Sequence, residues 1–289
     1  MKDLKHLIYF ESLLENANNE LVQKAQAEGN LALGYTCYHV PEALLNVGNC
    51  FSVRLRAPHT GSIDIATYYM SNYTCEFARA LVERGIEGGY QFLDAMIGVD
   101  ACSMMNRAME HFEILKVNDK PNFFVTHCDI PYKITDYTLD SYVKQMRIHV
   151  LDKLTEVYGV DTSDAAIRQA VKEHNEVCSI ISEMAEMRKA ENPVITGYEF
   201  HVINLVSYTC PKALILPYLR ETLKELKKRK PDEKSPFRAR VAIVGSEIDD
   251  PQLTKLIEGC GALVVSDRYC FGSTPGREVI ELKDDEDAL

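Results

Sequence analysis

Cysteine is the residue type of this 289-residue chain with the most potential for chemistry, because the chain has nine of them. No two form a Cys-x-x-Cys pair, so neither a ferredoxin-type nor a zinc-ribbon pattern applies. Three cysteines share a local context, since each is predicted at the start of a helix or in the loop after a strand. These three are Cys75, Cys102 and Cys270.

The surroundings of the three thiols predict that they meet. Cys75 directly follows Thr74, where a helix is predicted to begin, and Cys102 follows a continuous apolar run and opens the next helix. Cys270 lies in the loop after a further predicted strand. In an open parallel sheet, the carboxyl ends of strands and the helix starts behind them face one crevice. Helix starts also favour an anion, and therefore the thiolate form that binds metal.

Three converging thiolates allow more than one kind of site. They fit a [4Fe–4S] cluster with one open iron that could bind substrate, and they fit a zinc site with a fourth, non-cysteine ligand. Gly272 would let the backbone approach a bulky inorganic core closely. The remaining alternative is three unrelated buried thiols. Packing roles are predicted for four other cysteines: Cys50, Cys178, Cys210 and Cys260.

The elements that must position these residues alternate between strand and helix. Strands are predicted over 31–36, 51–55, 92–99, 122–126, 240–244 and 262–266. Helices are predicted over 3–28, 41–47, 74–84, 102–112, 139–158, 162–190, 212–229 and 251–258. Residues 56–72 are expected to be irregular. The alternation predicts an α/β fold with a parallel sheet.

The order of the elements predicts two α/β domains. Residues 1–136 are predicted to hold an N-terminal helix and a first α/β domain, and 137–193 a helical connection. Residues 194–289 are predicted to start a second α/β domain with only two clear strands, where a doubly wound sheet has about four to six. A charged, proline-bounded linker is expected over 230–236.

Composition excludes several classes of partner. The formal net charge of −11 leaves no basic stripe that could neutralise many phosphates, so a nucleic-acid partner is not expected. No apolar run is long enough to span a bilayer, and the charged N-terminus is neither a signal nor a transit peptide. The predicted location is the cytoplasm, where disulfides are not expected.

Several segments resemble one known family in the same order. The segments are GYTCYHVPEAL (34–44), TCEFAR (74–79), FLDA through DAC (92–102), the long helix 162–187, VAIVGS (241–246), GALVVSD (261–267) and CFG (270–272). Over about residues 30–289 the chain resembles the iron–sulfur subunits of 2-hydroxyacyl-CoA dehydratases and benzoyl-CoA reductases, such as the D-component of 2-hydroxyglutaryl-CoA dehydratase.

This resemblance implies a fold and a site. It implies two flavodoxin-like, doubly wound domains joined by long helices, with an iron–sulfur cluster between them held by Cys75, Cys102 and Cys270. It implies a dimer with an identical or paralogous subunit, an acyl-CoA substrate, and a separate ATP-hydrolysing iron–sulfur activator that injects one electron.

The resemblance also implies a reaction. In the dehydratases, the electron turns a 2-hydroxyacyl-CoA into a ketyl radical that expels the hydroxyl group and gives the 2-enoyl-CoA. Other members reduce aromatic thioesters, and some carry an [8Fe–9S] double-cubane cluster and act as reductases. An oxygen-sensitive lyase is therefore expected, with a reductase as the alternative.

Two departures from the family pattern leave a third interpretation open. The Cys-Asp pair of the family is Cys102-Ser103 here, and the chain stops after the Cys270 region, where relatives continue. The second domain is therefore expected to be truncated or completed by a partner. A non-catalytic partner subunit is the third hypothesis.

The resemblance also places Cys37 and His39 in the active crevice. Cys37 could contact the thioester or the cluster, and His39 could donate a proton to the leaving hydroxyl group. The alternative is that His39 is a surface residue and that Glu42 only caps the helix near Pro41. Cys128 could be an extra ligand, but a buried packing role is favoured.

Overall fold

The computed structural model describes residues 3–58, 60–232, 237–273, 277–283 and 287–289. It is a mixed α/β structure, as the alternating elements predict, and it folds into two compact units. Val22–Lys172 and Glu281–Leu289 form the four-stranded unit, and Met1–Leu21 and Glu173–Ile280 form the two-stranded unit. Each unit is described by itself.

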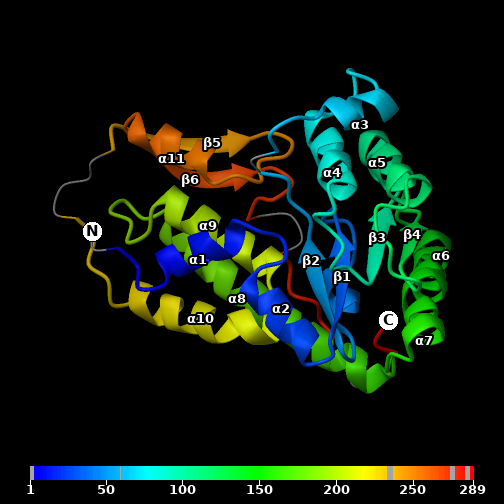
Figure 1. Cartoon of the computed structure of the whole chain (residues 1–289). Coiled ribbons are helices and arrows are strands. Elements are labelled where there is room, and N and C mark those ends of the chain that lie inside the picture. Colours follow the sequence, from blue (N-terminus) through cyan, green and yellow to red (C-terminus); the bar gives the residue numbers. More distant parts are fainter. Residues whose placement is uncertain (1–2, 59, 233–236, 274–276, 284–286) are drawn as a thin grey trace. The chain divides into compact units, whose positions relative to one another are not determined.

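The four-stranded unit is built on one parallel sheet (Figure 1). Its strands run in the order β2-β1-β3-β4, and every neighbouring pair is parallel. The strands are β1 (Leu31–Tyr35), β2 (Cys50–Arg54), β3 (Ala95–Val99) and β4 (Phe124–Cys128). β2 and β3 are buried along their whole length, which explains why β3 is a continuous apolar run; β2 carries Ser52 and Arg54 inside the core.

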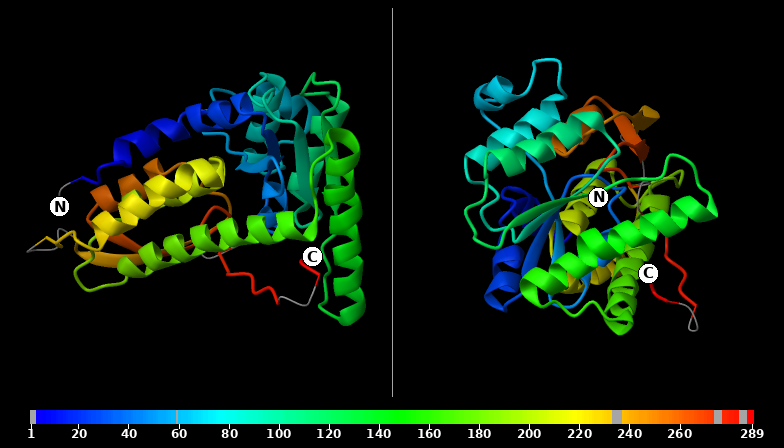
Figure 2. Two further views of the ribbon diagram at one scale, coloured as in Figure 1. Left: turned by 90° about the horizontal axis from the view of Figure 1, so that it is seen from below. Right: turned by 90° about the vertical axis from the view of Figure 1, so that its right-hand side faces the viewer.

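Helices connect and cover this sheet. They are η1 (Glu42–Asn46, a 3-10 helix), α3 (Asp64–Tyr69), α4 (Glu76–Ile86), α5 (Ser103–Ile114), α6 (Asp136–Met146), η2 (Arg147–Asp152, a π-helical stretch) and α7 (Lys153–Tyr158). Figure 2 shows α6, η2 and α7 as one continuous green rod. α6 and η2 pack against β4, and their buried side chains join a core that contains Leu33 and Ile97.

The two-stranded unit pairs β5 (Ala239–Val244) with β6 (Ala262–Arg268) in parallel. Its helices are α1 (Leu7–Leu14), α9 (Gly197–Thr209), α10 (Lys212–Leu226) and α11 (Gln252–Gly259). α9 is buried at every residue, and α1, α11 and β6 pack against it. Two helices cross the boundary between the units along the chain: α2 (Glu20–Ala27) and α8 (Asp164–Met187).

Three sequence-based expectations were wrong. Residues 3–28 form α1 and α2 rather than one helix, because asparagines between them bond to nearby main-chain groups: Asn16 accepts from the amide of Asn18, and Asn19 from that of Leu21. The region 56–72 contains α3. α9 was not predicted at all, because a helix buried on all sides has no polar face to reveal its period.

The predicted division into residues 1–136, 137–193 and 194–289 stays a prediction. The expected helical connection does consist of helices, but Glu173 within α8 begins the second segment of the two-stranded unit. The linker expected over 230–236 falls partly outside the described residues. Among the helices that the structure describes, none combines the length and apolar character needed to cross a membrane.

Candidate iron–sulfur ligands and their supports

Cys75 and Cys102 lie at the starts of two neighbouring helices. Cys75 is the N-cap residue of α4 and Cys102 is the N-cap residue of α5, and the two helices pack side by side (Figure 1). The expected cap, Thr74, lies one residue before this N-cap position of α4. α5 directly follows β3, and α4 follows β2 with α3 in between; each leads into the next strand, so both begin at the carboxyl edge of the sheet. The structure therefore brings these two predicted ligands to the same edge.

The exposure of the thiols separates candidate ligands from packing residues. Cys102 is exposed and Cys75 is partly buried, and neither side chain makes a capping hydrogen bond. By contrast, Cys50 and Cys128 lie in the core. Burial raises the pKa of Cys50 to about 12 and that of Cys128 to about 11, so these thiols stay protonated at neutral pH.

The remaining cysteines divide in the same way. Cys178 and Cys210 are buried, as their packing roles predict. Cys260 is exposed, so its predicted packing role was wrong. It lies at the C-cap of α11, just before Gly261, where the chain turns away from the helix toward β6.

Cys37 follows β1 by two residues, also at the carboxyl edge of the sheet. It is partly buried and packs against the core of the four-stranded unit. His39 stacks on Tyr38 with ring centroids 4.2 Å apart, and burial lowers its pKa. The carboxyl edge therefore carries the thiol of Cys37 and a neutral imidazole close to it in sequence.

Tyr142 is a polar residue at this edge that no motif predicted. It lies on α6, and its hydroxyl donates to the main-chain carbonyl of His39 at 3.2 Å. Burial, and then the charges of Cys128 and Cys37, raise the pKa of Tyr142 to about 12. It keeps its proton at neutral pH. Because α6 is distant in sequence from residues 37–39, only the fold brings Tyr142 to them.

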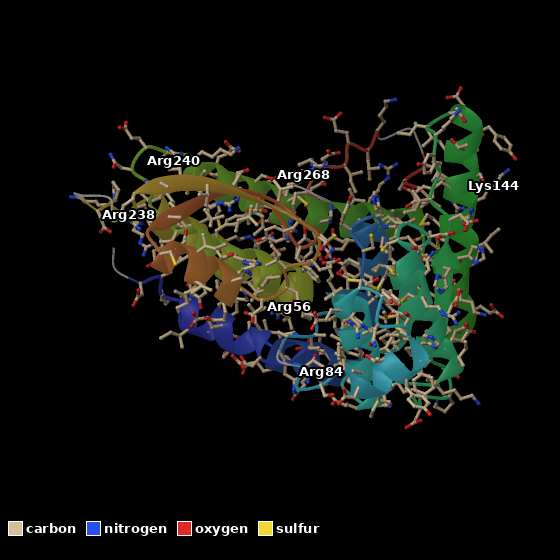
Figure 3. The ribbon with its side chains drawn as sticks, turned by 90° about the horizontal axis from the view of Figure 1, so that it is seen from above. Arg56, Arg84, Lys144, Arg238, Arg240 and Arg268 are labelled. Atoms are coloured by element: carbon tan, nitrogen blue, oxygen red, sulfur yellow. The ribbon has the colours of Figure 1, made fainter. Side chains whose placement is uncertain are left out.

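Cys270 lies in the two-stranded unit, two residues after β6 ends at Arg268. Figure 3 labels Arg268 at the end of β6, Arg240 in β5 and Arg238 just before β5. The amide of Cys270 donates to the carbonyl of Ser246 at 2.9 Å. The thiol is partly buried, while Tyr269 and Phe271 on either side are buried. The burial of Tyr269 and Phe271 therefore fixes the main chain on both sides of Cys270.

Side chains of α9 hold the loop that carries Cys270. The side-chain amide of Asn204 donates to the main-chain carbonyl of Phe271 at 2.8 Å. The hydroxyl of Tyr208 donates to the main-chain carbonyl of Gly272 at 3.3 Å. Arg277 donates to the side-chain oxygen of Asn204 at 2.8 Å, which orients this amide. Sequence reasoning missed all of these supports because it missed α9.

Gly272 is required by its own loop. A Cβ atom there would lie 2.7 Å from Oδ1 of Asp267 and 2.9 Å from the carbonyl oxygen of Tyr269. This close approach explains why a glycine occupies the position. The predicted contact of Gly272 with an inorganic core stays a prediction.

The three candidate ligands fit an iron–sulfur cluster in type and in exposure. Cys75 and Cys102 share one sheet edge, and Cys270 follows a strand of the other parallel sheet. None of the three is buried among core side chains, and thiolates are the usual ligands of such clusters. Among the residues described, no group of three or more His, Cys, Asp or Glu side chains forms a metal site. Cys75 and Cys102 belong to the four-stranded unit, and Cys270 belongs to the two-stranded unit.

Comparison with known proteins identifies the family. The family model described as 2-hydroxyglutaryl-CoA dehydratase, D-component, matches residues 37–289, which is most of the chain. The chain belongs to this D-component family. The resemblance seen in the sequence segments is thereby confirmed.

Three curated relatives of this D-component family member are distant in sequence. It is 19% identical over 259 residues to the (R)-phenyllactyl-CoA dehydratase beta subunit of Clostridium sporogenes. It is 20% identical over 245 residues to a benzoyl-CoA reductase subunit of Thauera aromatica. It is 21% identical over 208 residues to the beta subunit of (R)-2-hydroxyglutaryl-CoA dehydratase of Acidaminococcus fermentans.

The matches cover most of this chain but less of the relatives. They span 89%, 82% and 71% of the chain in the same order. They span 67%, 61% and 54% of the three relatives. All three relatives are named as subunits, so the family forms enzymes of more than one subunit.

Proposed function

We propose that this chain is the iron–sulfur subunit of a 2-hydroxyacyl-CoA dehydratase, with Cys75, Cys102 and Cys270 as the cluster ligands. The observation that carries the proposal is the pair of thiols at the N-caps of α4 and α5, both available at one edge of a parallel sheet. The two relatives named as dehydratase subunits support the reaction class.

The residues of the chain would prepare this site for the cluster. The first-turn N–H groups of α4 and α5 favour negative charge next to Cys75 and Cys102, where a cluster with thiolate ligands would be bound. The loop around Cys270 presents the third thiol between two buried side chains. When bound, a [4Fe–4S] cluster would supply one-electron chemistry and an open, Lewis-acidic iron for the thioester.

Cys37 and His39 are proposed to act on the substrate. The dehydration removes a hydroxyl group from a 2-hydroxyacyl-CoA by way of a ketyl radical, and the hydroxyl group needs a proton to leave as water. Burial lowers the pKa of His39, so its free ring is neutral at neutral pH; it would donate a proton to the leaving hydroxyl group only as the imidazolium, formed by taking up a proton from solvent. Tyr142 holds the main chain of His39 in place.

The properties of the whole enzyme extend the proposal. We assign it an acyl-CoA substrate, an identical or paralogous partner subunit, an ATP-hydrolysing iron–sulfur activator and a cytoplasmic location. The two units are proposed to be flavodoxin-like, with the second sheet incomplete. The order β2-β1-β3-β4 supports this for the first, since it is the beginning of the flavodoxin-like order 2-1-3-4-5.

A reductase of the same family is the second candidate. The relative named as a benzoyl-CoA reductase subunit favours it at an identity similar to that of the dehydratases. This alternative includes an [8Fe–9S] double-cubane cluster in place of [4Fe–4S].

Anaerobic purification with metal analysis tests the proposal. About four irons with matching sulfide per chain, and a low-temperature spin-resonance signal after reduction, are expected for a [4Fe–4S] protein. About eight irons would favour the double-cubane reductase, and zinc alone would exclude both. With its activator and partner, a dehydratase converts a 2-hydroxyacyl-CoA to the enoyl-CoA, whereas a reductase adds hydrogen to an unsaturated thioester.

A further inference from the structure

A buried ion pair lies beside the loop that carries Cys270. Arg188, just after α8, donates through Nη1 to Oδ2 of Asp267 at 2.7 Å. Only 2% of each side chain is exposed. The guanidinium also lies over the ring of Phe200, with its carbon 3.7 Å from the ring centroid. Burying two charges is costly unless they are well paired and their other hydrogen bonds are satisfied. Both side chains therefore need further hydrogen-bond partners in this loop.

The same carboxylate reaches across the loop. The amide of Ser273 donates to Oδ1 of Asp267, and the hydroxyl of Ser273 donates to Oδ2 at 3.2 Å. Arg188 completes the connection, because its Nη2 donates to the hydroxyl of Ser273 at 3.1 Å. Asp267 and Ser273 flank Cys270 in sequence, so Arg188 ties the two ends of the loop together.

The interior of the loop leaves little freedom. The amide of Gly272 donates to the carbonyl of Tyr269 at 2.8 Å, which closes a turn around Cys270. Gly272 has no room for a side chain, and the carbonyls of Phe271 and Gly272 accept from α9. Hydrogen bonds within the two-stranded unit therefore hold the loop, and none of them involves a metal.

We propose that Arg188 is a positioning residue which, through Asp267 and Ser273, holds the 267–273 loop so that Cys270 is a preformed metal ligand. The inference rests on the proposed function for the identity of the metal group. Its structural part, a loop already ordered before iron binds, does not depend on that function. Pre-organised ligands bind a metal more tightly, because less ordering remains to be done on binding.

The test compares thiol reactivity in the iron-free, full-length chain. Arg188→Lys keeps the charge but loses the planar guanidinium, and Asp267→Asn keeps the size of the side chain but not its charge. Each is expected to raise the rate of alkylation of Cys270 by iodoacetamide about tenfold, a change equivalent to about 1.4 kcal/mol, which is close to the lower end for one hydrogen bond to a charged group. The exposed Cys260 in the same chain is the reference thiol.

A second buried ion pair provides the matched control. Arg229 pairs with Glu199 at 2.8 Å, with 8% and 7% of the side chains exposed. Arg229→Lys should lower stability by a similar amount but leave the ratio of Cys270 to Cys260 alkylation within about twofold of wild type, since twofold is well below the change expected from one lost hydrogen bond. The buried Cys210 reports general loosening of the unit.

The outcomes separate the positioning role from a purely structural one and from the proposed function. A selective rise at Cys270 in the two loop variants, with Cys210 still protected, supports the inference, and so does a lower iron content after anaerobic reconstitution. An unchanged Cys270 rate, or an equal rise in Arg229→Lys, overturns it. If wild type takes up no iron, the proposed function fails, while the alkylation result still decides the role of Arg188.

Discussion

At the scale of single residues, burial divides the nine cysteines into accessible and inaccessible ones. Cys75, Cys102 and Cys270 are at least partly exposed, whereas Cys50 and Cys128 are core residues with raised pKa values. The division follows position: the first three begin helices or follow a strand, and the other two lie within strands. This position, and not the spacing of the cysteines, made the candidate ligands predictable from the sequence.

Cys128 should make the stability of the protein depend on pH. Burial raises its folded pKa to about 11 from an ordinary value of 9.0, so the stabilising, protonated form is fully present below about pH 9. Stability should fall by up to about 3 kcal/mol as the pH rises from 9 to 11. Urea unfolding at a series of pH values measures this.

Cys128→Ala serves as the comparison. It lacks the titrating thiol, so its free energy of unfolding should decline less steeply over the same pH range. Equal slopes for wild type and Cys128→Ala would show that the thiol of Cys128 is not the cause.

Gly272 provides a second prediction at this scale. Gly272→Ala places a methyl group against Asp267 and the main chain of Tyr269, and should destabilise the protein by about 1–3 kcal/mol. Gly259→Ala, in α11 with open space around it, should be neutral or stabilising by up to about 1 kcal/mol. Thermal unfolding distinguishes the two, and equal melting temperatures would contradict the account.

At the scale of elements, strands were easier to predict than the helix that supports Cys270. β1 and β3 are apolar runs bounded by polar residues, and β6 begins with such a run after Gly261; strands can be predicted from this pattern even when they are buried. α9 has histidine, asparagine, serine and threonine on buried positions, so its sequence resembles neither a surface helix nor a uniformly apolar one. Asn204 and Tyr208 became recognisable as supports only once the fold placed them beside residues 271 and 272.

The start of α9 depends on a carboxylate from another element. Glu258 of α11 accepts the amides of Gly197 at 2.8 Å, Tyr198 at 3.0 Å and Val264 at 3.1 Å. Glu258→Gln replaces one acceptor oxygen by a donor that would face a main-chain N–H. It should cost about 1–3 kcal/mol in free energy of unfolding, the usual cost of an unsatisfied buried group.

An exposed glutamate provides the control for Glu258. Glu186→Gln removes a surface partner of Lys189 and should change stability by less than about 1 kcal/mol. Urea denaturation measures both variants. Similar stabilities for Glu258→Gln and Glu186→Gln would show that α9 does not need this cap.

At the scale of the whole molecule, the three proposed ligands come from separate parts of the chain, with Cys75 and Cys102 in one unit and Cys270 in the other. The sequence predicted an α/β fold and the alternation of its elements, because each strand and most helices carry local signals. It did not predict that the unit containing Cys270 also includes α1, because the packing of α1 on α9 leaves no trace in either segment alone. The family model confirmed the family that the sequence segments resemble, and the reaction of this chain stays a proposal.

The central claim is that Cys75, Cys102 and Cys270, which come from the two units of the chain, bind one iron–sulfur cluster. The most direct measurement is the iron content per chain of anaerobically reconstituted Cys75→Ser, Cys102→Ser and Cys270→Ser, each compared with the exposed control Cys260→Ser. The account predicts that each of the three loses most of its iron and its spin-resonance signal, while Cys260→Ser retains both. Full iron content in any of the three, with an unchanged signal, would contradict it.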